Sequence, residues 1–315
     1  MPLDTRAATP IGLAFRAALT AAWASEAVVL AGCPSPEPAI DASELDASVL
    51  DDDASVDAAL DAPLPPCEAH AIDVVAGRVT DLSGSAVPSA RPQLCARLHP
   101  DARLVCLSPP FTDERGDFRI TVPPDVRCMD EAVLRVLVTR GPYAVTYCPL
   151  DLAPSSDGTL SLAAPIELAE IASAPTLPAA GDPASRREVD LGPVVIEISP
   201  TEAGGVAEYM RLGALAIDPA RSCVPEARAL AGLVAITPEQ SRLELPFRIA
   251  STGLTAGTSV DLFVIGGLDT RLADGSTVPE GELATFGRGV VGADGTIEPA
   301  VPLPQLGWLG WSPAR

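Results

Sequence analysis

The sequence contains no lysine and no asparagine, and histidine occurs only at His70 and His99. Aromatic residues make up only 4% of the 315 residues, so the chain has few rings from which to build a large aromatic binding surface. The basic residues, all of them Arg, number 21 against 42 acidic residues, which gives a net charge of −21. Because few cations are available to displace counterions from a polyanion, this balance excludes nucleic acid as a partner.

The scarcity of histidine also limits the catalytic sites that the chain can build. Ser-His-Asp, Cys-His and His-ligated metal sites all need a correctly placed imidazole. His70 lies at the end of the acidic segment and His99 precedes Pro100 in a predicted turn, so both are interpreted as surface residues. The GxSxG, HExxH and Walker A patterns are absent. Residues 287–292 do spell GxGxxG, but the Asp294-Gly295 turn follows at once and leaves no helix to hold a pyrophosphate. We therefore expect a protein that is not an enzyme and that uses no cofactor and no metal.

The N-terminus has the pattern of an export signal. Arg6 and Arg16 precede an apolar stretch over residues 17–32, which is shorter than the ~20 residues of a membrane-spanning helix and ends in Leu30-Ala31-Gly32-Cys33. This ending resembles the lipobox of bacterial lipoproteins. The resemblance implies that residues 1–32 are removed, that Cys33 carries the acyl chains, palmitate among them, and that the lipid bilayer is a partner. An ordinary secretory leader and a cytosolic N-terminal helix are the two alternatives.

Residues 33–66 differ sharply in composition from the rest of the chain. After Cys33 they contain nine acidic residues, six prolines, no basic residue and no aromatic residue. Such a segment buries too little apolar surface to offset the entropy lost on ordering, so we predict a disordered, extended tether. The run Asp51-Asp52-Asp53 lacks the glycine and glutamate spacing of an EF-hand and is interpreted as part of this spacer.

Residues 67–168 show short alternating apolar runs separated by Pro, Gly and Asp, which favours a β-sandwich. The predicted strands cover residues 73–80, 93–98, 104–107, 117–122, 134–139 and 144–148. In the most informative stretch, Asp113 starts a tight turn, Gly116 supplies a positive φ, and Phe118 and Ile120 then point inward.

A family resemblance covers about residues 70–150. It rests on Gly77-Arg78-Val79-Thr80-Asp81 with Gly84 and Pro88, and then on Thr112-Asp113, Gly116-Asp117-Phe118 and Pro123-Pro124. These residues resemble the carboxypeptidase regulatory-like, transthyretin-like β-sandwich of secreted bacterial proteins. The resemblance implies a structural or adhesive module without catalytic residues of its own.

Residues 169–188 are rich in Ala, Pro, Ser and Gly and are predicted to be a linker, and residues 189–315 are predicted to form a second β-sandwich. Alternation over 189–198 and 243–249, a buried run over 260–265, and turns at Asp274-Gly275 and Asp294-Gly295 indicate its strands. Parts of this region are similar to the terminal sandwich module of large bacterial surface proteins. The fold class is thus all-β, with two sandwiches after a signal peptide and a tether.

Six cysteines remain once Cys33 is assigned to the lipid, and an even number is typical of disulfide bonding in an oxidising compartment. Five of them lie in the first body and one in the second, so complete pairing requires one bridge between the bodies. Cys95 and Cys106 flank a turn and are the best cross-strand pair. Of the remaining partitions we favour Cys128 with Cys148 and Cys67 with Cys223. The alternative is that some or all of these thiols are free and buried.

Two further groups of residues are considered as ligand sites. Trp308 and Trp311 could form a platform for a saccharide, although closing the apolar end of the second sandwich is the simpler interpretation. Asp261, Asp269 and Asp274 are considered as calcium ligands, since extracellular β modules often bind this ion through carboxylates, but their spacing matches no known calcium loop.

Leader, tether and modules together predict a non-enzymatic, lipid-anchored cell-envelope protein that serves adhesion, scaffolding or contact with an envelope protein or polysaccharide. The alternative is a secreted carbohydrate-binding accessory or hydrolase that uses loop carboxylates and the two tryptophans. Pro34 differs from the Asp that retains some lipoproteins at the inner membrane, so the resemblance favours the outer membrane over a periplasmic or secreted location.

Overall fold

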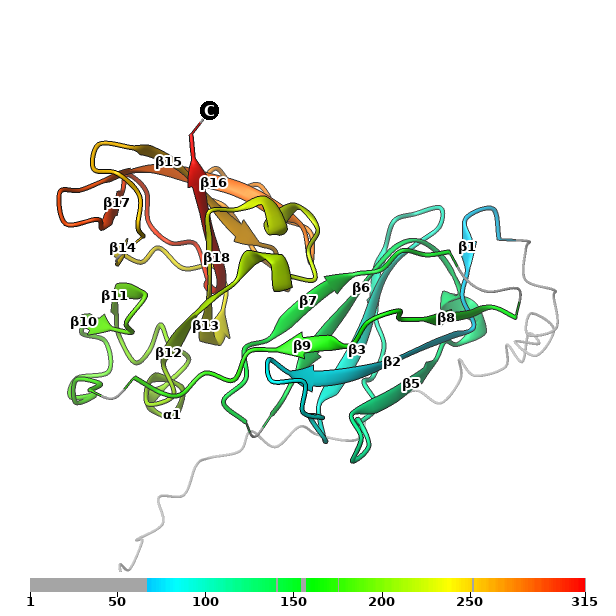
Figure 1. Cartoon of the computed structure of the whole chain (residues 1–315). Coiled ribbons are helices and arrows are strands. Elements are labelled where there is room, and N and C mark those ends of the chain that lie inside the picture. Colours follow the sequence, from blue (N-terminus) through cyan, green and yellow to red (C-terminus); the bar gives the residue numbers. More distant parts are fainter. Residues whose placement is uncertain (1–66, 140, 154–156, 175, 251, 315) are drawn as a thin grey trace, which may run out of the picture. The chain divides into compact units, whose positions relative to one another are not determined.

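The computed structural model describes residues 67–139, 141–153, 157–174, 176–250 and 252–314, all of which belong to one compact unit (Figure 1). Cys33, the predicted signal peptide and the predicted tether lie outside the described residues. Strands dominate the described chain, which confirms the predicted all-β class. We call residues 67–168 the N-terminal part and residues 187–314 the C-terminal part.

The N-terminal part contains a five-stranded antiparallel sheet in the described chain. Its order is β1-β6-β3-β4, with β7 also paired to β6. The strands are β1 (His70–Ala71), β3 (Arg91–Leu98), β4 (Leu104–Cys106), β6 (Cys128–Leu137) and β7 (Thr146–Pro149). Strand β6 thus pairs with three neighbours, and it begins at Cys128, well before the predicted start at Leu134. A short 3-10 turn, η2 (Pro124–Val126), leads into it.

A second sheet of the N-terminal part is built on β2 (Val74–Asp81). Strand β5 (Asp117–Thr121) pairs antiparallel with one edge of β2, and β8 (Thr159–Ser161) and β9 (Ile166–Leu168) pair parallel with its other edge. Buried side chains from both sheets form one apolar core, among them Val75, Val79, Leu94, Ile120, Leu134 and Val136. Two sheets around one core confirm the predicted first sandwich.

The predicted hairpin into β5 is present with the expected chemistry. Gly116 has φ +78°, and the Asp113 carboxylate accepts the backbone N–H groups of Arg115 at 2.8 Å and Asp117 at 2.9 Å. Phe118 and Ile120 are buried, whereas Arg119 and Thr121 on the other face are exposed. The local sequence therefore fixes both the turn and the face that β5 buries.

The C-terminal part is one antiparallel sheet of nine strands in the described residues, in the order β10-β11-β14-β17-β16-β15-β18-β13-β12. The strands are β10 (Arg187–Asp190), β11 (Val194–Ile198), β12 (Gly213–Ile217), β13 (Gly232–Gln240), β14 (Phe247–Ile249), β15 (Ser259–Ile265), β16 (Leu283–Val291), β17 (Ile297–Pro299) and β18 (Leu306–Pro313). Helix α1 (Val206–Tyr209) and the 3-10 turns η3 (Pro219–Arg221) and η4 (Glu226–Ala229) lie in its connections.

The apolar side chains of this sheet pack against one another across the sheet. Side chains near its two ends, such as Ile196 on β11 and Val234 on β13, belong to one core with Leu262 on β15. The hydrogen bonding stays continuous because β17 pairs with both β16 and β14. The second body is therefore a single curled sheet in which the two halves of the predicted sandwich remain hydrogen-bonded.

The GxGxxG stretch lies in β16, as its interpretation as a decoy requires. A Cβ at Gly287 would lie 2.0 Å from a methyl carbon of Val301, and one at Gly289 would lie 2.6 Å from Ile297. The turn at Asp294-Gly295 follows, with Gly295 at φ +81°. These glycines allow side chains to pack closely on the strand and are not part of a dinucleotide-binding turn.

All six cysteines from Cys67 to Cys223 are paired. Cys95 and Cys106 are bridged across β3 and β4, as predicted. The predicted partition of the other four is wrong, because the bridges are Cys67–Cys128 and Cys148–Cys223. The cause is strand pairing: β1 lies beside the start of β6, which brings Cys67 to Cys128, while Cys148 is opposite Leu134. One bridge does join the two parts, as predicted, but the partner of Cys223 is Cys148 and not Cys67.

Two glycines with similar φ values provide a test of the hairpin. At Gly116 a Cβ would lie 2.2 Å from the Val79 carbonyl oxygen, whereas at Gly295 nothing lies within 4 Å. Both replacements by Ala place a side chain at positive φ, which costs about 1–2 kcal/mol, and only Gly116→Ala adds a clash. Urea denaturation should show the larger loss of unfolding free energy for Gly116→Ala. Equal losses would contradict this packing.

Candidate functional site

The strongest candidate site is the contact region between the N-terminal and C-terminal parts, which we call the joint. Its apolar centre combines side chains from both parts: Cys95, Val133, Ala144 and Tyr147 with Ile217, Val224, Leu233, Ala235, Ile265 and Trp308. Ala169 and Ile171, at the start of the predicted linker, are 1% and 2% exposed and belong to the same cluster. The joint therefore has an apolar cluster of its own beside the cores of the two parts.

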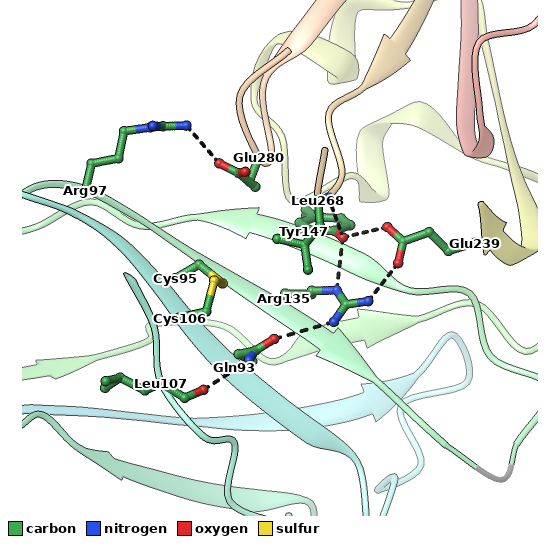
Figure 2. The surroundings of a disulfide bond; sticks show 10 residues. All are labelled: Gln93, Cys95, Arg97, Cys106, Leu107, Arg135, Tyr147, Glu239, Leu268 and Glu280. Atoms are coloured by element: carbon green, nitrogen blue, oxygen red, sulfur yellow. Dashed lines mark hydrogen bonds and ion pairs between the residues drawn. A yellow bond between two sulfur atoms is a disulfide. The ribbon is translucent and has the colours of Figure 1, made fainter. Parts of the chain in front are cut away.

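A polar hub centred on Tyr147 lies within this apolar contact (Figure 2). The Tyr147 hydroxyl on β7 donates to the Glu239 carboxylate on β13 at 2.5 Å. It accepts hydrogen bonds from Arg135 Nε and from the backbone N–H of Leu268, both at 3.0 Å. Arg135 on β6 also pairs with Glu239 at 2.9 Å. One phenol thus joins two strands of the N-terminal part to a strand and a loop of the C-terminal part.

Burial controls the protonation of this hub. Desolvation, followed by the negative charge of Glu239, raises the pKa of the Tyr147 phenol well above its ordinary value. Burial opposes the charge of Arg135, but the neighbouring Tyr147 and Glu239 leave the pKa of its guanidinium raised. A neutral phenol and a charged guanidinium therefore share the Glu239 side chain as their common hydrogen-bond acceptor.

Two ion pairs flank the hub. Arg97 on β3 contacts Glu280 at 3.0 Å, and the Glu280 side chain is only 8% exposed (Figure 2). Arg221 on η3 pairs with Glu167 on β9 at 2.7 Å and donates to the Leu82 carbonyl, also at 2.7 Å. The second pair is one-third exposed, so its contribution is small. Both pairs add polar contacts between the N-terminal and C-terminal parts to those of the hub.

Trp308 and Trp311 do not form the predicted ligand platform. Their exposed fractions are 8% and 7%. The Trp308 indole N–H donates to the Val145 carbonyl at 2.7 Å across the joint, and Trp311 belongs to the core of the C-terminal part. The apolar positions of β18 bury both rings, so neither presents a face to a saccharide, and the simpler interpretation of the pair is correct.

The polar residues considered for metal binding lie apart. Asp261 pairs with Arg288, Asp269 pairs with Arg242 and Arg271, and Asp274 accepts from Ser276. His99 contacts Asp130 at 3.0 Å. His70 is exposed on β1. Across the described ranges, no three His, Cys, Asp or Glu side chains are grouped so that they could hold a metal ion.

A cavity of about 280 Å³ adjoins the Arg97–Glu280 pair. Apolar side chains such as Val133 and Leu150 line it together with the carboxylates of Asp130, Asp151 and Glu282. The cavity is therefore an acidic recess at the edge of the joint.

Comparison with known proteins places the chain in no family. No family model and no curated protein matches it. Distant similarity is found to SpaA, a shaft pilin of Lactobacillus rhamnosus GG, at 8% identity and a TM-score of 0.24 over 71% of this chain and 79% of that one. A streptococcal ancillary pilin is 9% identical with a TM-score of 0.22, over 77% of this chain and 54% of that one. BcpA, the major pilin subunit of Bacillus cereus, is 11% identical with a TM-score of 0.21, over 74% of this chain and 85% of that one.

None of the helices in the described part of the chain has the length and apolar character needed to cross a membrane.

The joint was not foreseen from the sequence. Glu239 and Tyr147 are separated by 92 positions, and Glu239 follows a run of buried residues in β13 without any motif. The useful signal was Tyr147 itself, a polar aromatic residue between Thr146 and Cys148 in a predicted buried strand. A buried phenol needs a partner, but the sequence does not say which.

Replacing Tyr147 tests the hub. Tyr147→Phe removes the hydroxyl that contacts Arg135, Glu239 and Leu268, and it should lower the unfolding free energy by about 1–3 kcal/mol because buried polar groups lose their partner. The control is Tyr209→Phe, since the Tyr209 hydroxyl makes one hydrogen bond, to Pro178 at 3.1 Å. Urea denaturation should give the smaller loss for the control. An equal or larger loss for Tyr209→Phe would refute the special role of the hub.

Proposed function

We propose that this chain is a non-enzymatic, lipid-anchored protein of the cell envelope that displays its two β-rich parts as one unit for adhesion or scaffolding. The observation that carries the proposal is the joint, in which the Cys148–Cys223 bridge and the Tyr147 hub hold the parts in a single arrangement. A fixed arrangement suits a protein that presents a surface to a partner.

The disulfides support an exported location. Three bridges use every cysteine from Cys67 onward, and structural disulfides persist mainly in oxidising compartments outside the cytosol. This pattern agrees with the lipobox resemblance at residues 30–33, which implies acylation of Cys33 and, through Pro34, the outer membrane.

The proposed tether joins the unit at a defined point. Cys67 directly follows the acidic segment 34–66 and is bridged to Cys128 at the start of β6. Fully extended, the segment would reach roughly 110 Å at about 3.3 Å per residue. The two β-rich parts would then stand clear of the membrane surface, where an envelope protein or a polysaccharide could reach them.

Cys33→Ala tests the anchor. The unchanged chain should enter the detergent phase on phase separation, and Cys33→Ala should move to the aqueous phase because the acyl chains supply the membrane affinity. Intact mass of the native protein should show an N-terminus at Cys33, added acyl mass, and the loss of six hydrogens to three bridges.

Unchanged partitioning of Cys33→Ala would reject the lipid anchor. Native protein that retains Met1 and free thiols would reject export as well.

A further inference from the structure

The three disulfides differ in how they divide the chain. Cys67–Cys128 and Cys148–Cys223 span 61 and 75 positions and follow one another without overlap. Cys95–Cys106 spans 11 positions and lies wholly inside the first loop. A covalent route therefore runs from Cys67 through Cys128 and Cys148 to Cys223, and it bypasses residues 68–127 and 149–222.

We propose that this route carries tension between the tether and the C-terminal part, so that the protein is a load-bearing link. Force that enters at Cys67 passes through the first bridge directly into β6, and force that leaves at Cys148 passes through the second bridge to the chain that leads into β13. The residues inside the two loops cannot be pulled out by backbone extension, because the bridges hold their ends together.

The segment without a covalent bypass, residues 128–148, includes strand β6 and most of strand β7. Strand β6 is hydrogen-bonded to β1, β3 and β7. This segment also carries Arg135 and Tyr147, which hold Glu239 on the far side of the second bridge. On that side β13 is paired with both β12 and β18. The polar hub and the bridges therefore strengthen the same route.

The connectivity matters for this function. The pairing of Cys67 with Cys223 would have led force straight to the C-terminal part and left the N-terminal sandwich off the route. The observed pairing instead keeps the N-terminal part in line. The inference rests on the proposed function only in the assumption that force enters through the tether.

Single-molecule stretching of the oxidised mature chain tests the route. The chain carries Cys33→Ala to remove the lipid and has a handle at each end. Fully stretched, the oxidised chain should be shorter than Cys67→Ala/Cys128→Ala by about 165 Å, at about 3.3 Å per residue, because the intact Cys95–Cys106 bridge still closes 11 of the 61 freed positions. It should be shorter than Cys148→Ala/Cys223→Ala by about 250 Å, at about 3.3 Å per residue. The matched control is Cys95→Ala/Cys106→Ala, which should leave the stretched length unchanged because that bridge lies off the route.

A second measurement needs no substitution. Reductant added to the oxidised chain under constant load should lengthen it by about 250 Å when Cys148–Cys223 opens. Opening of both Cys67–Cys128 and Cys95–Cys106 should add a further length of about 200 Å, at about 3.3 Å per residue, which decides the matter if a variant fails to fold. A longer chain for the Cys95→Ala/Cys106→Ala control, or the absence of either step, would overturn the proposal. The stretching experiment uses no lipid, so it can fail while the Cys33 anchor stands, and the anchor can fail while the load route stands.

Discussion

The hydrogen bonds of Tyr147 to Glu239 and Arg135 are the contact on which the arrangement of the two β-rich parts depends. Each part has its own apolar core, and an apolar contact alone would allow the parts to slide, because dispersion and hydrophobic burial have little directionality. A carboxylate and a guanidinium that are largely withdrawn from solvent, as Glu239 and Arg135 are, differ from apolar groups, since each is costly without its partner. The geometry that satisfies all three side chains at once therefore selects one relative placement. The Cys148–Cys223 bridge, next to Tyr147 in the chain, makes that placement covalent.

Local chemistry was predictable, and non-local chemistry was not. The turn from Asp113 to Gly116 and the inward positions Phe118 and Ile120 follow from residues that are neighbours in sequence. Strands β8 and β9 have three residues each, too few to show a period of two in the sequence. Both form by pairing with β2, which lies far earlier in the chain. The cysteine count indicated bridging and required one link between the parts. The partition depended on the pairing of the two-residue strand β1 with β6, which the sequence does not encode locally.

The difference between local and non-local determinants also explains why both tryptophans are buried. From the sequence, closing the apolar end of the second sandwich is the simpler interpretation of the two indoles, but a ligand platform would use the same large apolar area. Strand β18 lies between β13 and β15 and so has neighbours on both edges. Trp308 therefore lies in the apolar contact of the joint and finds its hydrogen-bond acceptor at Val145. The interior position of β18 in the sheet thus accounts for the burial of both rings.

Charge also shapes the joint. The chain has half as many cations as carboxylates, and Arg97, Arg135 and Arg221 are all engaged with carboxylates at the joint. Two of these pairs, Arg97 with Glu280 and Arg135 with Glu239, lie largely out of solvent, where the attraction between opposite charges is screened less by salt than at the surface. Arginines that are scarce in the chain as a whole are therefore used where the two β-rich parts meet, and there they add direction to an apolar contact that has little of its own.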